Sequence, residues 1–265
     1  MQENYATVDG KKIRYLEEGR SGETIVLLHG LGGMAERWLP VIPMLSSKYR
    51  IVAPDLPGFG LSDKPQIDYT PDLFRHVTLG LLESLSLDNV YLIGTSLGGE
   101  IVAECAATQS PVIKKAVMVC PAGIMKKSTP ALDAYIMAAL YPNRESVKMA
   151  YQMMAGEAGQ VSDNAVENFI ASMSRSNTKM AFLSTLLGMK NSPPITEKLD
   201  LIKIPVLLIW GSEDKMIPLE YSSGFTASIP QCKFVVMNGC GHVPYEERPS
   251  EFSSHVLEFL SKHVQ

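Results

Sequence analysis

The sequence predicts an α/β fold built on a mostly parallel sheet. Short, nearly continuous apolar runs alternate with segments of helical pattern, as happens when parallel strands are buried on both faces and joined by helices. The chain has 265 residues, of which 46% are hydrophobic and 20% charged, and its formal net charge is -4. These values favour one large folded domain with an insertion over a disordered chain or two equal domains.

An antiparallel hairpin is expected at the start of the chain. The runs Tyr5–Val8 and Ile13–Leu16 flank Asp9-Gly10, which is a two-residue hairpin signal. The six apolar runs that follow are predicted as strands, which gives an eight-stranded sheet: Thr24–His29, Arg50–Pro54, Asn89–Ile93, Lys115–Cys120, Pro205–Trp210 and Lys233–Met237.

Helices are expected between these strands. Thr70-Pro71 supplies an N-cap and a first helical residue, and the helix it opens is predicted to end near Leu85. Further helices are predicted at Leu97–Gln109 and Pro249–His263. Flanking helices and buried strands together specify a layered α/β domain.

Residues 123–190 break this alternation, because they contain no convincing strand. The segment is rich in Ala, Met, Leu and Ser, and Pro142 and Gly156 interrupt its helical spacing. It is too long for a plain crossover loop, so an insertion of three or four helices is expected. Eight of the 14 methionines of the chain lie in it. Most of them are expected to pack the helices, and the others to line a pocket for a hydrophobic acyl or aromatic group.

Charge, cysteine count and hydropathy exclude several classes of protein. A pI near 5.8 gives no basic face for nucleic acid. The four cysteines have no paired metal-ligand spacing, and Cys232 and Cys240 flank an extended run that holds them too far apart for a disulfide, so buried free thiols are expected. The absence of an apolar run of about 18 residues and of a signal-peptide pattern leads us to expect a soluble, cytoplasmic protein without a membrane span.

The strongest chemical signal is Gly94-Thr95-Ser96-Leu97-Gly98. It follows the predicted strand at 89–93 directly and opens a helix, which is the strand–turn–helix setting of a G-x-S-x-G nucleophile elbow. Glycine two positions before and after the serine lets the strand and the helix approach each other. Ser96 is therefore the candidate nucleophile.

A serine hydroxyl needs a base, and that base needs an orienting acid. His242 lies in a glycine-rich loop just after the strand at 233–237, and Asp214 follows the strand at 205–210. Both loops are at the carboxyl ends of strands, where an open α/β sheet carries its site. Glu213 is the competing carboxylate, but Asp214 is favoured. The order Ser96, Asp214, His242 is the chain order of α/β-hydrolases.

With these residues in place, the chain resembles the α/β-hydrolase superfamily over essentially its full length. The likeness is carried by the elbow, the Gly211–Asp214 and Gly241-His242 segments, His29-Gly-Leu-Gly-Gly33 and Asp55-Leu-Pro-Gly-Phe-Gly-Leu-Ser-Asp63. The resemblance implies a core domain of residues 1–122 and 191–265 with a helical cap at 123–190. It also implies an oxyanion hole formed by the backbone N–H groups of Leu31 and Leu97.

Two other motifs are rejected. Gly30-Leu-Gly-Gly-Met-Ala35 followed by Asp55 fits a dinucleotide-binding pattern, but that pattern leaves the elbow, Asp214 and His242 unexplained. The glycines from Gly94 to Gly99 have P-loop spacing, but Glu100 stands where lysine is needed and would repel phosphate. We therefore expect no cofactor and no metal.

The expected activity is that of a carboxylesterase, with an acyl-enzyme on Ser96 and a small-molecule hydrophobic ester as substrate and partner. The layout also resembles the meta-cleavage-product hydrolases, which split carbon–carbon bonds. That family carries a cap arginine and a tryptophan after the catalytic histidine, whereas here Val243 follows His242 and Arg175 is the nearest cationic residue in the cap. Carbon–carbon hydrolysis, acyl transfer and a non-catalytic, receptor-like role remain open, and so does a homodimer.

Overall fold

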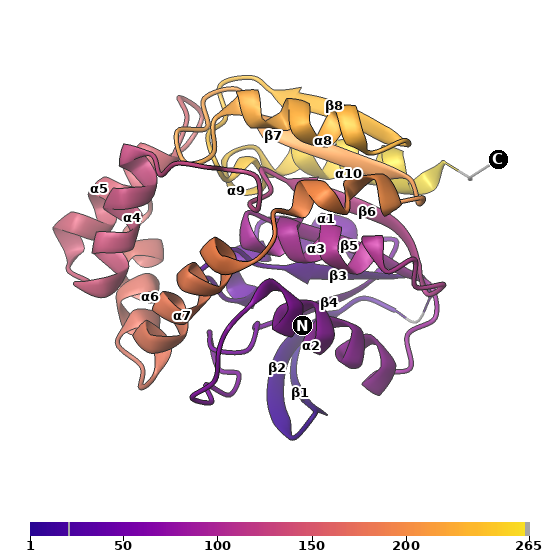
Figure 1. Cartoon of the computed structure of the whole chain (residues 1–265), viewed down its shortest axis with the longest axis horizontal. Coiled ribbons are helices and arrows are strands. Elements are labelled where there is room, and N and C mark those ends of the chain that lie inside the picture. Colours follow the sequence, from indigo (N-terminus) through magenta and orange to yellow (C-terminus); the bar gives the residue numbers. More distant parts are fainter. Residues whose placement is uncertain (21, 263–265) are drawn as a thin grey trace.

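The computed structural model describes residues 1–20 and 22–262 and confirms the predicted α/β fold with an eight-stranded sheet (Figure 1). The strand order is β1-β2-β4-β3-β5-β6-β7-β8. β2 runs antiparallel to β1 and β4, and the pairings from β4 through β3 to β8 are parallel. The strands are β1 (Gln2–Val8), β2 (Lys11–Glu18), β3 (Thr24–Leu28), β4 (Arg50–Pro54), β5 (Val90–Thr95), β6 (Ile113–Val119), β7 (Val206–Gly211) and β8 (Cys232–Met237).

The predicted hairpin turn is confirmed. Asp9 and Gly10 join β1 to β2 with φ angles of 48° and 73°, the positive values that a two-residue type I′ turn requires at both central positions. Every residue of β3, β5 and β7 is buried, as expected for central parallel strands. β8 differs, because it is an edge strand and most of its residues are partly or fully exposed. Cys232 at its start is consequently only partly buried, whereas the other three free thiols are buried.

Helices cover both faces of the sheet (Figure 1). Those of the core are α1 (Ile42–Leu45), α2 (Pro71–Ser84), α3 (Leu97–Ala107), α8 (Ser222–Ser228), α9 (Pro244–Glu247) and α10 (Pro249–Ser261). The predicted N-cap of α2 is confirmed, because the Thr70 hydroxyl accepts the N–H of Leu73 at 3.2 Å. α10 is described to Ser261, and the predicted end at His263 lies outside the described residues.

Four helices connect β6 to β7: α4 (Pro130–Leu140), α5 (Arg144–Met154), α6 (Asp163–Met173) and α7 (Thr178–Asn191). We call residues 123–190 the helical insertion, although α7 ends one residue later. Local sequence explains where three of these helices begin. The side chains of the N-cap residues Thr129, Asn143 and Ser162 each accept the backbone N–H of the residue three positions later. Figure 1 shows the insertion beyond one end of the sheet.

Among the described residues, no helix has both the length and the apolar character that a bilayer span requires.

Candidate active site

Ser96 lies on a strained turn between β5 and α3. Its φ of 54° and ψ of -118° place it in a backbone region that a non-glycine residue occupies at a cost of about 1 to 3 kcal/mol. The flanking glycines are sterically required. A Cβ on Gly94 would lie 2.1 Å from the carbonyl oxygen of Gly98, and one on Gly98 would lie 2.2 Å from that of Leu28. The turn therefore projects the serine side chain beyond the carboxyl end of the sheet.

The structure brings His242 and Asp214 together. Nδ1 of His242 lies 2.8 Å from Oδ2 of Asp214, and both side chains are buried. The second carboxylate oxygen accepts the backbone N–H groups of Met216 and Ile217 at 2.8 and 2.9 Å. Both oxygens are thus partnered, which fixes the carboxylate against the imidazole.

Glu213, the competing carboxylate, points elsewhere. Its Oε2 accepts the backbone N–H of Glu157 in the helical insertion at 2.9 Å. Asp214 is therefore the carboxylate that contacts His242, and Glu213 connects the β7 loop to the insertion.

The loop that carries His242 is held by contacts that the sequence did not reveal. The backbone N–H of His242 donates to the carbonyl of Met154 at the end of α5, at 2.8 Å. The Glu247 carboxylate accepts the N–H groups of Gly241 and Gly156, at 3.0 and 2.9 Å. The insertion thus fixes the position of the histidine loop.

Residues 29–33 and 55–63, two of the segments that carry the family resemblance, stabilise each other and form the loop opposite Ser96. His29 is fully buried, its Nε2 accepts the N–H of Leu56 at 2.9 Å, and burial lowers its pKa, so that it is a neutral structural residue. Asp55 accepts the N–H groups of Ala35 and Leu61, both at 2.7 Å. Its carboxylate is therefore already used within the fold, which removes the role that a dinucleotide-binding pattern would assign to it.

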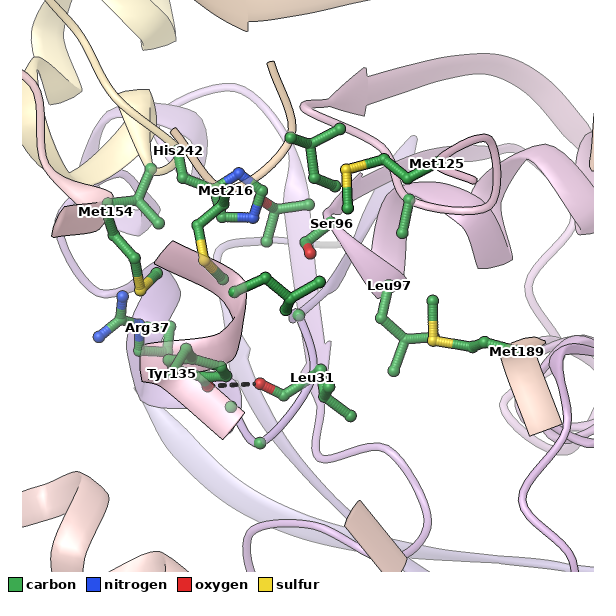
Figure 2. Close-up of a pocket in the computed structure, with 18 of the residues that line it drawn as sticks. Leu31, Arg37, Ser96, Leu97, Met125, Tyr135, Met154, Met189, Met216 and His242 are labelled. Carbon is green, nitrogen blue, oxygen red and sulfur yellow. Dashed lines mark hydrogen bonds between the residues drawn. The ribbon is translucent and has the colours of Figure 1, made fainter. Parts of the chain in front are cut away.

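A large cavity, with a volume of about 1420 Å³, is lined by four of the five predicted site residues (Figure 2). Ser96, Leu97, His242 and Leu31 all line it, and Asp214 lies behind His242. Leu97 is the first residue of α3, and Leu31 follows the end of β3. The carboxyl ends of β3, β5 and β8 thus face the insertion across this space.

Three methionines of the insertion line the cavity: Met125, Met154 and Met189 (Figure 2). Met173 is fully buried among the helices. Five of the eight methionines pack against the hydrophobic core, namely Met125, Met153, Met154, Met173 and Met189. The other three, Met137, Met149 and Met180, are each more than half exposed. They lie on the outer faces of α4, α5 and α7, where helical spacing alone cannot distinguish them from packed positions.

The arginine at the cavity is Arg37, which the sequence did not single out. Arg175 is exposed at the turn between α6 and α7 and does not line the cavity. Nε of Arg37 lies 2.7 Å from a carboxylate oxygen of Glu246, and its guanidinium lies over the ring of Tyr151 at 5.2 Å. Burial by itself would lower the pKa of Arg37, but the Glu246 carboxylate and the surrounding tyrosines together raise it well above its ordinary value, so the arginine remains a cation.

Cys120 is a third polar group beside Asp214 and His242. Within the described residues, these three form the one cluster of His, Cys, Asp or Glu side chains that could supply three metal ligands, with atoms within 4.8 Å of one another. Burial, followed by the charge of Asp214, raises the pKa of the Cys120 thiol, which keeps it protonated. Because Nδ1 of His242 already pairs with Asp214, the cluster is internally satisfied.

A family model described as alpha/beta hydrolase fold matches residues 23–249. The chain belongs to this family. This alpha/beta hydrolase is similar to the 2-hydroxy-6-oxo-6-(2'-aminophenyl)hexa-2,4-dienoic acid hydrolase of Metapseudomonas resinovorans. The two sequences are 27% identical over 271 residues, and the match covers 98% of this chain and 91% of the relative.

Two solved alpha/beta hydrolase structures are similar over nearly the whole chain. A serine hydrolase involved in carbazole degradation has a TM-score of 0.88 at 25% identity, with 98% of both chains covered. A membrane phospholipase A, described as a bacterial virulence factor, has a TM-score of 0.87 at 25% identity, with 98% of this chain and 85% of that chain covered. The fold is thus shared with proteins whose described activities differ.

Proposed function

We propose that this alpha/beta hydrolase is a serine hydrolase in which Ser96 is the nucleophile, His242 the general base and Asp214 the acid that orients it. The observation that carries the proposal is the 2.8 Å contact between His242 and Asp214 behind a cavity that Ser96 enters from a strained turn. A strained, partly exposed serine that shares a cavity with an oriented imidazole is the arrangement that acyl transfer requires.

In the proposed reaction, His242 takes the Ser96 proton while Oγ bonds to a carbonyl carbon of the substrate. The backbone N–H groups of Leu31 and Leu97 would stabilise the resulting oxyanion, and one such donor is typically worth about 3 kcal/mol. His242 then protonates the leaving group as its bond to the carbonyl carbon breaks. Water, deprotonated by His242, attacks the acyl-enzyme and releases the acid together with free Ser96.

Residues 123–190 would act as a cap over a core of residues 1–122 and 191–265. Support comes from the three methionines that the insertion contributes to the cavity and from its contacts with the His242 loop. Unbranched, polarizable methionine side chains suit an adaptable apolar surface, so the substrate is expected to be large and mostly hydrophobic.

The first candidate bond is a carbon–carbon bond in a vinylogous 1,5-diketone, in which the departing carbon is stabilised as a conjugated enolate. It is supported by the likeness to the hexadienoic acid hydrolase over 98% of the chain. Lys126, Lys127 and Lys190 line the cavity and are exposed, so their charges suit a substrate that carries a carboxylate.

The second candidate bond is a carboxylic ester, whose leaving group is an alkoxide. It is supported by Val243, which follows His242 where meta-cleavage-product hydrolases carry tryptophan, and by Arg175, which lies outside the cavity. Ester hydrolysis requires neither a tryptophan after the catalytic histidine nor a cap arginine, because an alkoxide needs only the proton from His242 to leave.

The experiment measures hydrolysis of a 2-hydroxy-6-oxohexa-2,4-dienoate bearing a 6-phenyl group beside p-nitrophenyl esters of increasing acyl length. The Ser96→Ala variant should lose about 10³-fold or more in kcat/KM on whichever class is hydrolysed. Ser254→Ala, an exposed serine on α10, is the matched control and should equal the parent. Equal activity of Ser96→Ala and the parent would overturn the assignment of Ser96 as the nucleophile. Tight substrate binding by the parent with no turnover would favour a receptor-like role.

A further inference from the structure

The loop that carries Leu31 is a four-residue turn, residues 30–33, whose central peptide is conformationally the least restricted. The N–H of Gly33 donates to the carbonyl of Gly30 at 3.0 Å and closes the turn, and Gly32, its third residue, has a φ of 70°. A positive φ at this position is what a type II turn requires. Glycine adopts either sign of φ at little cost, so the peptide that joins Leu31 to Gly32 could rotate while the turn stays closed.

One side chain of the helical insertion holds that peptide. The hydroxyl of Tyr135 donates a 2.6 Å hydrogen bond to the carbonyl oxygen of Leu31 (Figure 2). The contact joins α4 to the loop after β3, across 104 positions of sequence. It is also sterically close, because a Cβ on Gly32 would lie 3.0 Å from the Tyr135 oxygen.

The Tyr135 ring is itself fixed by two other helices of the insertion. Its centroid lies 5.4 Å from that of Phe169 on α6 and 6.2 Å from that of Phe182 on α7. The side chain is 6% exposed and lines the cavity. Packing of three helices therefore determines where the hydroxyl lies, and the hydroxyl determines where the Leu31 carbonyl points.

We propose that Tyr135 is a positioning residue for the oxyanion loop. Its hydrogen bond holds the Leu31 carbonyl toward α4. The Leu31 N–H lies in the preceding peptide but on the same Cα, so the bond that anchors the carbonyl also restrains the direction in which this N–H faces the reacting carbonyl. The inference rests on the proposed serine hydrolase function. Donors stabilise a transition state only if they are aimed in advance at the developing charge. Tyr135 thus makes oxyanion stabilisation depend on the placement of the insertion.

The test compares Tyr135→Phe with Tyr141→Phe on the substrate class that the parent hydrolyses. Phenylalanine at position 135 keeps the packed ring and removes only the hydroxyl. Tyr141 directly follows α4, is exposed and lies outside the cavity. For Tyr135→Phe we expect kcat to fall about 10-fold or more and KM to change less than about threefold, since a part-displaced oxyanion donor weakens the transition state rather than binding. Phosphonylation of Ser96 by a p-nitrophenyl phosphonate, which also forms an oxyanion, should slow by a similar factor.

Thermal unfolding of both variants distinguishes a local effect from a loss of fold. An unfolding midpoint close to that of the parent, with kcat lowered in Tyr135→Phe alone, supports the proposal. A raised KM with unchanged kcat would assign Tyr135 to substrate contact and overturn it, and so would parent-like kinetics and phosphonylation. If Ser96→Ala retained full turnover, the proposed function itself would fail, an outcome that is separate from any result with Tyr135.

Discussion

The backbone N–H of His242 donates to the carbonyl of Met154, the last residue of α5, so the helical insertion contacts the loop of the proposed base directly. Tyr135 connects the same insertion to the loop of the proposed oxyanion donor. Two separate loops at the carboxyl end of the sheet are therefore fixed by one segment. The proposed chemistry depends on the insertion for geometry as well as for an apolar surface.

Asp214→Asn is expected to lower kcat by as much as about 10⁴-fold, because an amide in this place favours the wrong tautomer of His242 and no longer stabilises its cationic form. Steady-state kinetics with the preferred substrate provide the measurement. Glu213→Gln is the matched control, since that carboxylate bonds to Glu157 rather than to His242, and it should stay within about threefold of the parent. A larger loss in Glu213→Gln than in Asp214→Asn would reverse the assignment of the acid.

Stability is expected to fall as pH rises, because of a buried carboxyl behind the nucleophile. Glu100 on α3 is almost fully buried, and none of the described residues forms a hydrogen bond with its Oε2. Burial, followed by the nearby Glu104, raises its pKa to about 8. Between the usual value of 4.5 and about 8, the folded chain binds more protons than the unfolded chain, so the free energy of unfolding decreases through this window. The full effect is up to about 5 kcal/mol.

Glu100→Gln, which cannot ionise, should remove this dependence. Urea unfolding at pH 5 and pH 9 measures this dependence. We expect the variant to be more stable than the parent at pH 9, by up to about 5 kcal/mol, and similar to it at pH 5. Glu83→Gln, an exposed carboxyl on α2, serves as the control and should follow the parent at both pH values. The same pH dependence in Glu100→Gln and the parent would show that Glu100 is not responsible.

Met189→Trp is expected to restrict the size of the substrate, because Met189 lines the cavity from α7 and a larger ring would occupy part of it. The value of kcat/KM should fall about 10-fold or more for octanoyl and longer esters or for the phenyl dienoate, and change little for an acetyl ester. Met180→Trp introduces the same ring on the exposed side of α7 and should keep the parental profile. An equal loss for short and long substrates would show that this side chain does not limit length.

Features that depend on a few neighbouring residues could be predicted from the sequence. The Asp9-Gly10 turn, the Thr70 cap and the crowded glycines around Ser96 each follow from steric or hydrogen-bonding rules that act within a few positions. Apolar runs predicted the strands to within about three residues at their ends, because a central parallel strand is buried on both faces whatever its partners are. The ends of β8 were also predicted, but its partial exposure was not, since an edge position is a property of the sheet and not of the run.

The role of the polar side chains around the cavity was decided by tertiary structure. Arg37 lies at the cavity and Arg175 does not, although only the second belongs to the expected cap. Glu247, Tyr135 and Glu213 bond to segments that are 91, 104 and 56 positions away, and no local pattern marks such partners. Likewise, three of the insertion methionines have apolar spacing but face away from the cavity.

By itself, the sequence determined the fold class, the strained serine and the two strand-end loops from which Asp214 and His242 arise, because each depends on local backbone sterics and on burial along one strand. Only the tertiary structure decided that Asp214, and not its neighbour, meets the imidazole, and that the insertion holds both the histidine loop and the Leu31 turn. The physical reason is that a hydrogen bond between distant segments requires a distance of about 3 Å between two atoms, which only the packing of the whole chain sets.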